Sequence, residues 1–335
     1  MNTPANQNVV TSINIDIFRA ILAQGIIWHH LGPILFHRPT VPGLMAVWSF
    51  FVISGYLNAN AFARRRQRSS WIDASRLFYL SRIKRIYPLL IISFITVSII
   101  TKDFLNGDIY TLFPFIYFAN IPLNNVVLWT LIIEVQLYAM TPILFLVINA
   151  IRLEVPMLLI GSFLFTIAVS ALHISLWGDS VLIDRSMLGN LGFYLLGMAI
   201  ALRHTDYCKF SSFGKQIFLI LAFSILAWLL VAYNLLAQMP RLWAGCFVSI
   251  IFSFIVLTHS KELFGSANTQ LRNLGKLTYQ IYVFHGLFLF IYSQYLELHN
   301  PYYAIVLLFA LPIIAATTYQ HLLLRFETCK IAKVV

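Results

Sequence analysis

The sequence predicts an all-α membrane protein, a polytopic bundle of about ten transmembrane helices that forms one domain. Hydrophobic residues make up 60% of the 335 positions and charged residues only 10%, and the mean hydropathy is +0.81. Soluble globular domains do not have this composition. Apolar runs long enough to cross a bilayer also recur along the whole chain. We place these runs at 13–35, 43–63, 86–101, 126–150, 156–177, 187–202, 216–236, 241–258, 277–294 and 302–323.

The basic residues predict which side of the membrane each connection occupies. The segment 64–85, between the second and third runs, is a basic loop that the positive-inside rule places in the cytoplasm. It contains Arg64, Arg65, Arg66, Arg68, Arg76, Arg82, Lys84 and Arg85. With ten spans and both termini in the cytoplasm, most other basic residues fall on the same side. The short stretch 110–121 is broken by Pro114 and followed by Pro122, so we expect a re-entrant or interfacial segment there.

Charge, cysteines and the N-terminus narrow the class of protein further. Membrane orientation explains the formal charge of +11 without a nucleic-acid partner. The three cysteines show no paired or metal-ligand spacing, so we expect neither a disulfide framework nor a metal site. The first residues lack the features of a removable signal peptide, and we expect no fused soluble domain.

The first apolar run holds side chains that are costly to bury in a membrane. Asp16 lies three residues before Arg19, close enough on a helix to neutralise or orient the guanidinium. Ten residues separate Arg19 from His30, which is about three helical turns and places both on one face. His29, the residue before His30, lies on a different face of the helix from Arg19 and His30. This pattern indicates chemistry, or alternatively a helix-end ion pair with an interfacial histidine pair beside Trp28.

The second run and the basic loop carry two weaker motifs. Ser54 and Gly55 form a step that lets a neighbouring helix, or less often a ligand, approach the backbone closely. Arg82 and Arg85 lie three apart just before the third run, on one predicted helical face. A pair of arginines there is suited to hold phosphates, although such a cluster also serves as an orientation signal.

Two later runs contain isolated polar side chains. Glu134 lies inside the fourth run, where a carboxyl group suits a partner for a histidine or a purely structural hydrogen bond. In the ninth run Tyr279 and Tyr282 share a helical face and His285 follows them. Taken alone, such a histidine is more often a packing or hydrogen-bonding residue than a catalyst.

Together these segments resemble the membrane acyltransferase-3 family, whose members O-acylate surface glycans and related hydroxyl substrates. The resemblance lies in five ordered motifs: Asp16, Arg19 and His30; Phe-Phe-x-x-Ser-Gly at 50–55; Arg-x-x-Arg-Ile-x-Pro at 82–88; Trp-x-Leu-x-x-Glu-x-Gln-x-Tyr at 129–138; and Tyr-x-x-Tyr-x-x-His at 279–285. It implies supporting roles for Asp16, Ser54, Gly55, Trp129, Gln136, Tyr138, Tyr279, Tyr282 and His285. The family's frequent second acid after the glutamate is Val135 here, so a role that needs paired carboxylates is in doubt.

The resemblance implies a bacterial-type inner-membrane enzyme that takes an acyl group, in most cases acetyl, from acyl-CoA in the cytoplasm. The acceptor would be a hydroxyl of a cell-surface glycan or a lipid-linked sugar. In this hypothesis Arg82 and Arg85 hold the phosphates of the coenzyme, and its pantetheine arm enters beside Arg19. His30 acts as general base or carries the acyl group, and Glu134 orients it or stabilises its imidazolium. The alternatives are a transporter or flippase of a sugar or lipid, and a family member without catalysis.

Overall fold

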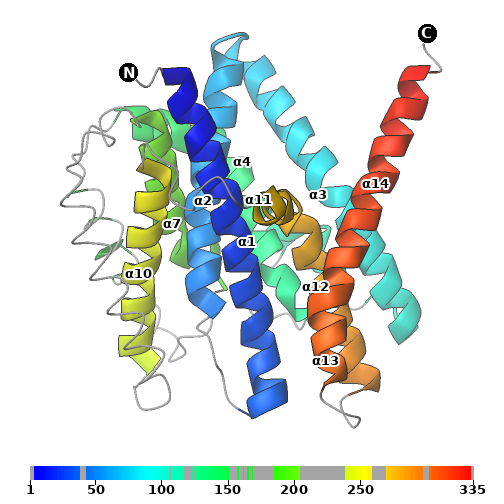
Figure 1. The fold of residues 1–335 in the computed structure, drawn as a ribbon. Helices are drawn as coiled ribbons and strands as arrows, with labels where there is room; N and C mark the ends of the chain where they lie inside the picture. The colour runs from blue at the N-terminus through cyan, green and yellow to red at the C-terminus, as the bar shows by residue number, and fades with distance from the viewer. Residues whose placement is uncertain are drawn as a thin grey trace.

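The computed structural model describes a bundle of helices (Figure 1). It covers residues 4–37, 43–105, 107–116, 123, 125–150, 185–203, 238–258, 269–296 and 302–332, with isolated residues between 157 and 168. The helices are α1 (Pro4–Phe36), α2 (Gly43–Arg66), α3 (Trp71–Thr101), α4 (Trp129–Ala150), α7 (Met187–Leu202), α10 (Gln238–Thr258), α11 (Thr269–Lys276), α12 (Thr278–Tyr295), α13 (Tyr303–Ile305) and α14 (Leu311–Ala332). Short 3-10 turns occupy Gly107–Thr111, Pro114–Ile116 and Val126–Leu128, and a π turn, Val306–Ala310, joins α13 to α14.

The all-helical prediction is confirmed for the described residues, but the count of about ten spans is not. The predicted runs 156–177 and 216–236 lie outside the described residues, apart from a few isolated positions in the first. Each of the other predicted runs coincides with a helix. Within the described part, four helices are long and apolar enough to cross a membrane: Gly43–Arg66, Trp71–Thr101, Val126–Ala150 and Tyr303–Arg325. A fifth crossing is added if α11 and α12 together form one bent span.

α1 is long but is not one of these four helices, and its own sequence explains why. Arg19, Gln24 and the two histidines His29 and His30 lie along its described length and lower its hydropathy. The polar side chains that point to chemistry are therefore the same ones that weaken its signal as a span.

The segment 64–85, which we expected to be a loop, is mostly helical. α2 continues through Arg66 and α3 begins at Trp71, so only a short turn separates the two helices. Ser70 caps α3, because its hydroxyl oxygen accepts a hydrogen bond from the backbone N–H of Asp73 at 3.2 Å. The cap starts the helix early and places Arg82 and Arg85 on α3.

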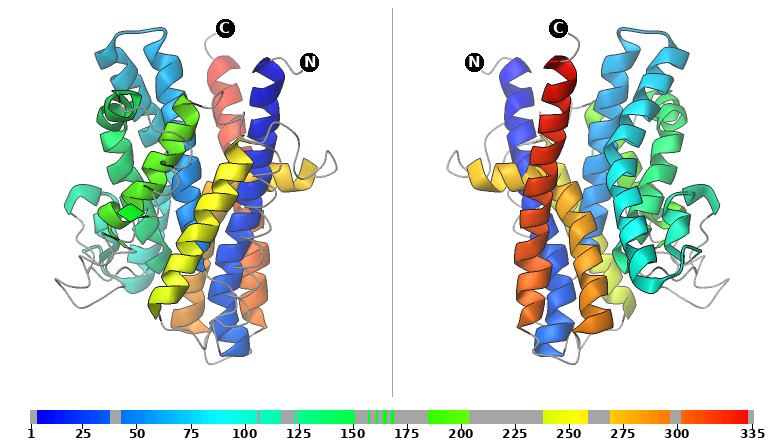
Figure 2. Two further views of the ribbon diagram at one scale, coloured as in Figure 1. Left: turned by 90° about the vertical axis from the view of Figure 1, so that its left-hand side faces the viewer. Right: turned by 90° about the vertical axis from the view of Figure 1, so that its right-hand side faces the viewer.

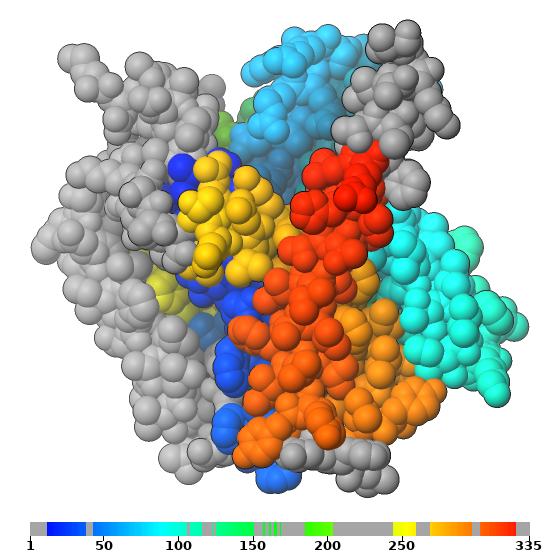
Figure 3. All heavy atoms as spheres, turned by 45° about the vertical axis from the view of Figure 1, so that its right-hand side comes forward, coloured from blue at the N-terminus to red at the C-terminus, as the bar shows by residue number. Residues whose placement is uncertain are grey.

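The two ends of the chain and the basic α2–α3 turn lie at the same end of the bundle. Figure 1 shows both termini and the α2–α3 turn at one end of the bundle, and the end of α1 at the other. α11 lies across the direction of the other helices in Figure 2, and its axis is bent by 69° from that of α12. A Cβ at Gly275 would lie only 1.7 Å from the backbone oxygen of Asp16, so α11 packs directly on α1. In Figure 3 α14 runs along one face between α11 and α3.

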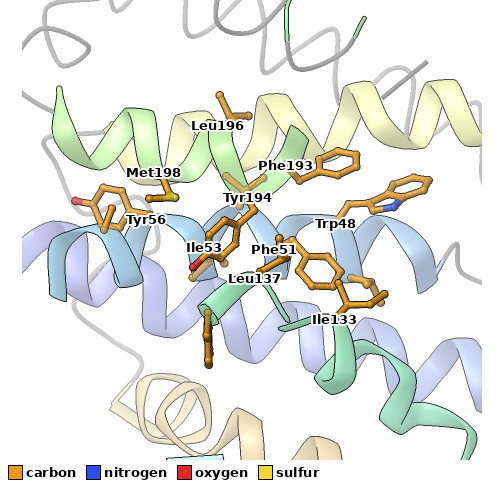
Figure 4. Packing of buried hydrophobic residues seen from close by; sticks show 14 of the residues in the cluster. Trp48, Phe51, Ile53, Tyr56, Ile133, Leu137, Phe193, Tyr194, Leu196 and Met198 are labelled. Atoms are coloured by element: carbon orange, nitrogen blue, oxygen red, sulfur yellow. The ribbon is translucent and has the colours of Figure 1, made fainter. Parts of the chain in front are cut away.

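The densest packing joins α2 to α7, with α4 alongside (Figure 4). Trp48 of α2 stacks on Phe193 of α7, with ring centroids 5.5 Å apart. A Cβ at Gly55 would lie 2.1 Å from the backbone oxygen of Tyr194, and one at Gly197 would lie 1.9 Å from that of Val52. Gly55 in the Ser-Gly step of α2 therefore allows a neighbouring helix to pack closely, which the sequence favoured over the approach of a ligand. This interface fixes the helix that carries Ser54.

Candidate active site

A cavity that is partly open to the outside lies between α1, α2, α3, α4 and α12. Most of the polar residues singled out in the sequence line it. They are Arg19, Ser54, Arg82, Arg85, Glu134, Tyr138, Tyr279 and Tyr282. The remaining lining is mainly apolar and includes Ile26, Val47, Phe50 and Phe51. Residues from all five sequence motifs thus line one cavity.

Glu134 is held in this cavity by a small hydrogen-bond network. Its Oε1 accepts a hydrogen bond from the Ser54 hydroxyl at 3.1 Å and another from the Tyr138 hydroxyl. Asn58 Nδ2 donates in turn to the Ser54 oxygen at 3.1 Å. Asn58 was not predicted as a site residue, although its position four residues after Ser54 places it on the same helical face. The network ties α2 to α4 and fixes the carboxylate.

Three arginines line the same cavity as that carboxylate. The Arg82 guanidinium lies over the rings of Phe78 and Tyr138, at 5.1 and 5.4 Å from their centroids. Its Nε is buried and has no hydrogen-bond partner in the described part of the chain. Arg19 lies within electrostatic range of Arg85 and Glu134. With three positive groups and one negative group, the lining suits an anionic ligand such as a phosphate.

Asp16 has a partner that the sequence pattern did not reveal. Its Oδ2 lies 3.7 Å from Nε of Arg272 on α11, an ion pair between neighbouring helices. The charge of Asp16 also acts on Arg19, as the three-residue spacing predicts. The α11 helix was not predicted, because its eight residues lie outside the apolar runs. Asp16 therefore connects the Arg19 region to α11.

The rings of His30 and His285 are in contact further along α1, beyond the residues that line the cavity. Their ring centroids are 5.6 Å apart, and His285 is only 1% exposed. The neighbouring His29 directs its Nδ1 to the start of α2, where it accepts a hydrogen bond from Gly43 N–H at 3.3 Å. On α1 the cavity lining extends as far as Ile26, one helical turn before His30. The arginine cavity and the histidine pair thus lie along the same stretch of α1.

Glu134 accepts hydrogen bonds from Ser54 and Tyr138, and its predicted action on His30 stays a prediction. The aromatic ring that the structure places beside His30 from another helix is that of His285.

The remaining predicted residues join the helices around the site. The Tyr282 hydroxyl donates to the Val127 carbonyl at 2.7 Å and lies 2.6 Å from the Thr130 hydroxyl. The Tyr279 hydroxyl donates to the Ile86 carbonyl at 2.6 Å. At the start of α4 Trp129 is buried, and further along Gln136 Nε2 donates to the Pro114 carbonyl at 2.7 Å. These bonds fix α12 and α4 around the cavity. Within the described residues there is no group of three or more histidine, cysteine, aspartate or glutamate side chains that could hold a metal ion.

A family model described as an acyltransferase domain matches residues 12–319, which includes every residue of the cavity and of the histidine pair. The chain belongs to the acyltransferase-3 family. With its candidate spanning helices, it is a multi-pass membrane protein of that family.

The chain is also similar to proteins of Staphylococcus aureus. It is 23% identical to the protein named Putative O-acetyltransferase SACOL0978 of strain COL, over 90% of this chain and 55% of that protein. It is 26% identical to O-acetyltransferase OatA of strain NCTC 8325, over 88% of this chain and 53% of that protein. The chain spans about half the length of these curated relatives. No solved structure matches it.

Proposed function

We propose that this protein is an integral-membrane O-acetyltransferase that moves an acetyl group from acetyl-CoA to a hydroxyl of a cell-surface glycan or lipid-linked sugar. The names of its relatives support O-acetyl transfer, and the family match supports acyl transfer over the transporter alternative. The observation that carries the proposal is the cavity that Arg19, Arg82 and Arg85 line together with one carboxylate, and whose lining on α1 ends at Ile26, one helical turn before His30.

The donor site follows from the charge of this cavity. A coenzyme A thioester carries several phosphate charges on a long and mostly neutral arm. Arg82 and Arg85 hold its phosphates, because guanidinium groups bind phosphate oxygens in pairs of hydrogen bonds. The arm then passes Arg19 and follows α1 past Ile26 toward His30. The apolar lining at Val47, Phe50 and Phe51 suits the neutral arm.

The chemistry at His30 is a proton transfer coupled to attack on the thioester. The unprotonated imidazole takes the proton of the acceptor hydroxyl while the hydroxyl oxygen bonds to the acetyl carbonyl carbon. The carbon–sulfur bond then breaks, and the imidazolium returns the proton to the departing thiolate, which leaves as free coenzyme A. The products are an O-acetyl ester and a thiol, and His30 is unchanged.

The orientation in the membrane is part of the proposal. The basic α2–α3 turn and both termini lie in the cytoplasm of a bacterial-type inner membrane, because short basic connections stay inside. This places the arginines on the side that holds acetyl-CoA and His30 toward the outer leaflet, where the acceptor arrives.

The test is acetyl transfer in membranes that contain the protein, with labelled acetyl-CoA and the isolated surface glycan of the host. We expect the wild type to label the glycan and to release free thiol in equal amount. His30→Ala should lose at least about 100-fold of this activity. His321→Ala, a change at an exposed histidine of α14, is the matched control and should keep it. A flippase would move its substrate without releasing thiol. A His30→Ala variant as active as wild type would contradict this mechanism.

A further inference from the structure

His285 lies at a position where it can act on His30 directly. It belongs to α12 and His30 to α1, and their ring centroids are 5.6 Å apart with 43° between the ring planes. At this separation a nitrogen of one ring can donate a hydrogen bond to a nitrogen of the other when the two face each other. His29, the other titratable group whose ring contacts His30, comes from α1 itself and is bonded to Gly43.

The hydrogen bond of His285 determines which of its nitrogens carries the proton. Its Nδ1 lies 2.7 Å from the backbone oxygen of Tyr282. A carbonyl oxygen only accepts hydrogen bonds, so Nδ1 is the donor and bears the hydrogen. In the neutral ring Nε2 is then an acceptor with a free lone pair. This atom is buried and has no hydrogen-bond partner in the described structure, which is costly unless a donor reaches it.

The surroundings of His285 hold its ring in place. The Tyr282 ring lies edge-on to it, with centroids 5.3 Å apart, and the Tyr282 hydroxyl is bonded to Thr130 and to the Val127 carbonyl. The next residue, Gly286, lies so close to Asn125 that a Cβ there would be 2.3 Å from the amide oxygen. α12 therefore cannot shift easily relative to the start of α4, and the acceptor nitrogen of His285 keeps its position.

We propose that His285 is a positioning residue for His30, and this inference rests on the function proposed above. When the substrates bind, the ring of His30 turns so that its N–H reaches the buried Nε2 of His285. This nitrogen accepts the hydrogen bond, and the other nitrogen of His30 is left unprotonated and turned toward the substrates. When that nitrogen takes the proton of the acceptor hydroxyl, the same hydrogen bond stabilises the imidazolium. His285 thus orients the catalytic histidine and stabilises its imidazolium, the role that a carboxylate has in other histidine-dependent acyl transfers. The orienting group for His30 is a second histidine, while Glu134 belongs to the arginine cavity.

Two variants and one control test the hydrogen bond. His285→Leu removes the acceptor, and His285→Gln retains one in its side-chain carbonyl oxygen. His321→Leu makes the same change at an exposed histidine of α14. We expect His285→Leu to lower kcat by about tenfold or more while the KM for acetyl-CoA stays within about twofold. His285→Gln should recover most of the lost kcat, and the control should match wild type.

A second measurement does not depend on turnover. Diethyl pyrocarbonate modifies the unprotonated imidazole nitrogen, and mass spectrometry gives the rate at His30. We expect this rate to fall severalfold in His285→Leu and to recover in His285→Gln. If both variants lose kcat equally, or if neither changes the rate at His30, His285 only packs and the inference is wrong. If the wild type transfers no acetyl group, the proposed function fails, and the modification rates still decide whether His285 acts on His30.

Discussion

Among the described residues, Glu134 is the one acidic side chain in the lining of the arginine cavity, and its charge opposes the binding of an anionic ligand there. Glu134→Gln keeps an oxygen that can accept from Ser54 and Tyr138 but removes the negative charge. We expect this variant to bind acetyl-CoA severalfold more tightly at low salt, because the excess of positive groups grows. Raising the salt concentration should reduce the difference. Equilibrium binding to purified protein in detergent gives both results.

Ser54→Ala is the control for this prediction, since it removes one hydrogen bond to Glu134 and leaves the charge. If Glu134→Gln and Ser54→Ala weaken binding alike, the geometry of the carboxylate matters more than its charge.

Ile26 lies where the cavity ends on α1 and is 3% exposed. Ile26→Ala removes side-chain volume between the cavity and His30, so a longer acyl chain fits. We expect transfer of butyryl relative to acetyl groups to increase by about tenfold or more, in line with the value of a methylene group in a specificity pocket. Competition between the two labelled donors in membranes measures this ratio.

Ile27→Ala is the matched control for Ile26→Ala. Ile27 is 1% exposed but packs with Leu31 and Leu308 in another cluster. Both changes should cost about 2–5 kcal/mol of stability, so protein levels are equalised first. A similar change in donor preference in both variants would show that loosening of the bundle, and not the position of Ile26, controls the acyl group.

The sequence identified the charged residues that line the cavity, but not their partners on distant helices. Arg19 and Glu134 stood out because a charge in an apolar run is expensive without a function, and Arg82 because it forms a pair with Arg85 just before the third run. The contact of His30 with His285, and that of Asp16 with Arg272, depend on how distant helices are placed against each other. Hydrophobic periodicity gives the faces of a helix but not which remote residue each face meets.

At the scale of helices, the crossing of α2 and α7 depends on two glycines. A Cβ at Gly55 or Gly197 would lie about 2 Å from a backbone oxygen of the other helix, and a backbone atom cannot move aside as a side chain does. We expect Gly55→Ala to destabilise the protein by about 1–3 kcal/mol or more through overpacking. Because α2 carries Ser54, acetyl transfer should fall as well. Thermal unfolding in detergent, followed with transfer assays, measures both effects.

Gly25 of α1 provides the control, because a Cβ there has no atom within 4 Å. Gly25→Ala should be neutral or slightly stabilising, since alanine is the better helix former. A Gly55→Ala protein as stable as Gly25→Ala would mean that α2 and α7 can separate without cost.

Helix positions were largely predictable, and the differences occur where capping overrides hydropathy. The runs at 126–150 and 187–202 agree closely with the helices observed there. α3 begins well before the predicted 86, because Ser70 and Asp73 form a helix start that a hydropathy scan does not detect. The 110–121 stretch, where it is described, forms short 3-10 turns and not a spanning helix, as its prolines indicated.

At the scale of the whole molecule, the histidine pair lies on helices that are poor spans by composition, whereas α2, α3 and α4 around the cavity are candidate spans. α1 carries the charged and histidine side chains, and α11 and α12 count as one span only across a 69° bend. A protein that positions polar groups inside a bilayer has to weaken the hydropathy of the helices that hold them. Membrane crossings are therefore hardest to count from the sequence for the helices that carry the polar side chains, α1, α11 and α12.

The two ends of the bundle predict a sidedness that labelling can measure. Gln67, in the α2–α3 turn, and His37, directly after α1, are both exposed. Figure 1 shows that turn and the end of α1 at opposite ends of the bundle. In a background without native cysteines, we expect Gln67→Cys to react with a membrane-impermeant maleimide only in inverted vesicles, because the arginines around it keep the turn in the cytoplasm. His37→Cys should react only in right-side-out vesicles. The reverse pattern would place the arginine cavity away from cytoplasmic acetyl-CoA and would overturn the proposed donor site, whatever the variants of His30 do.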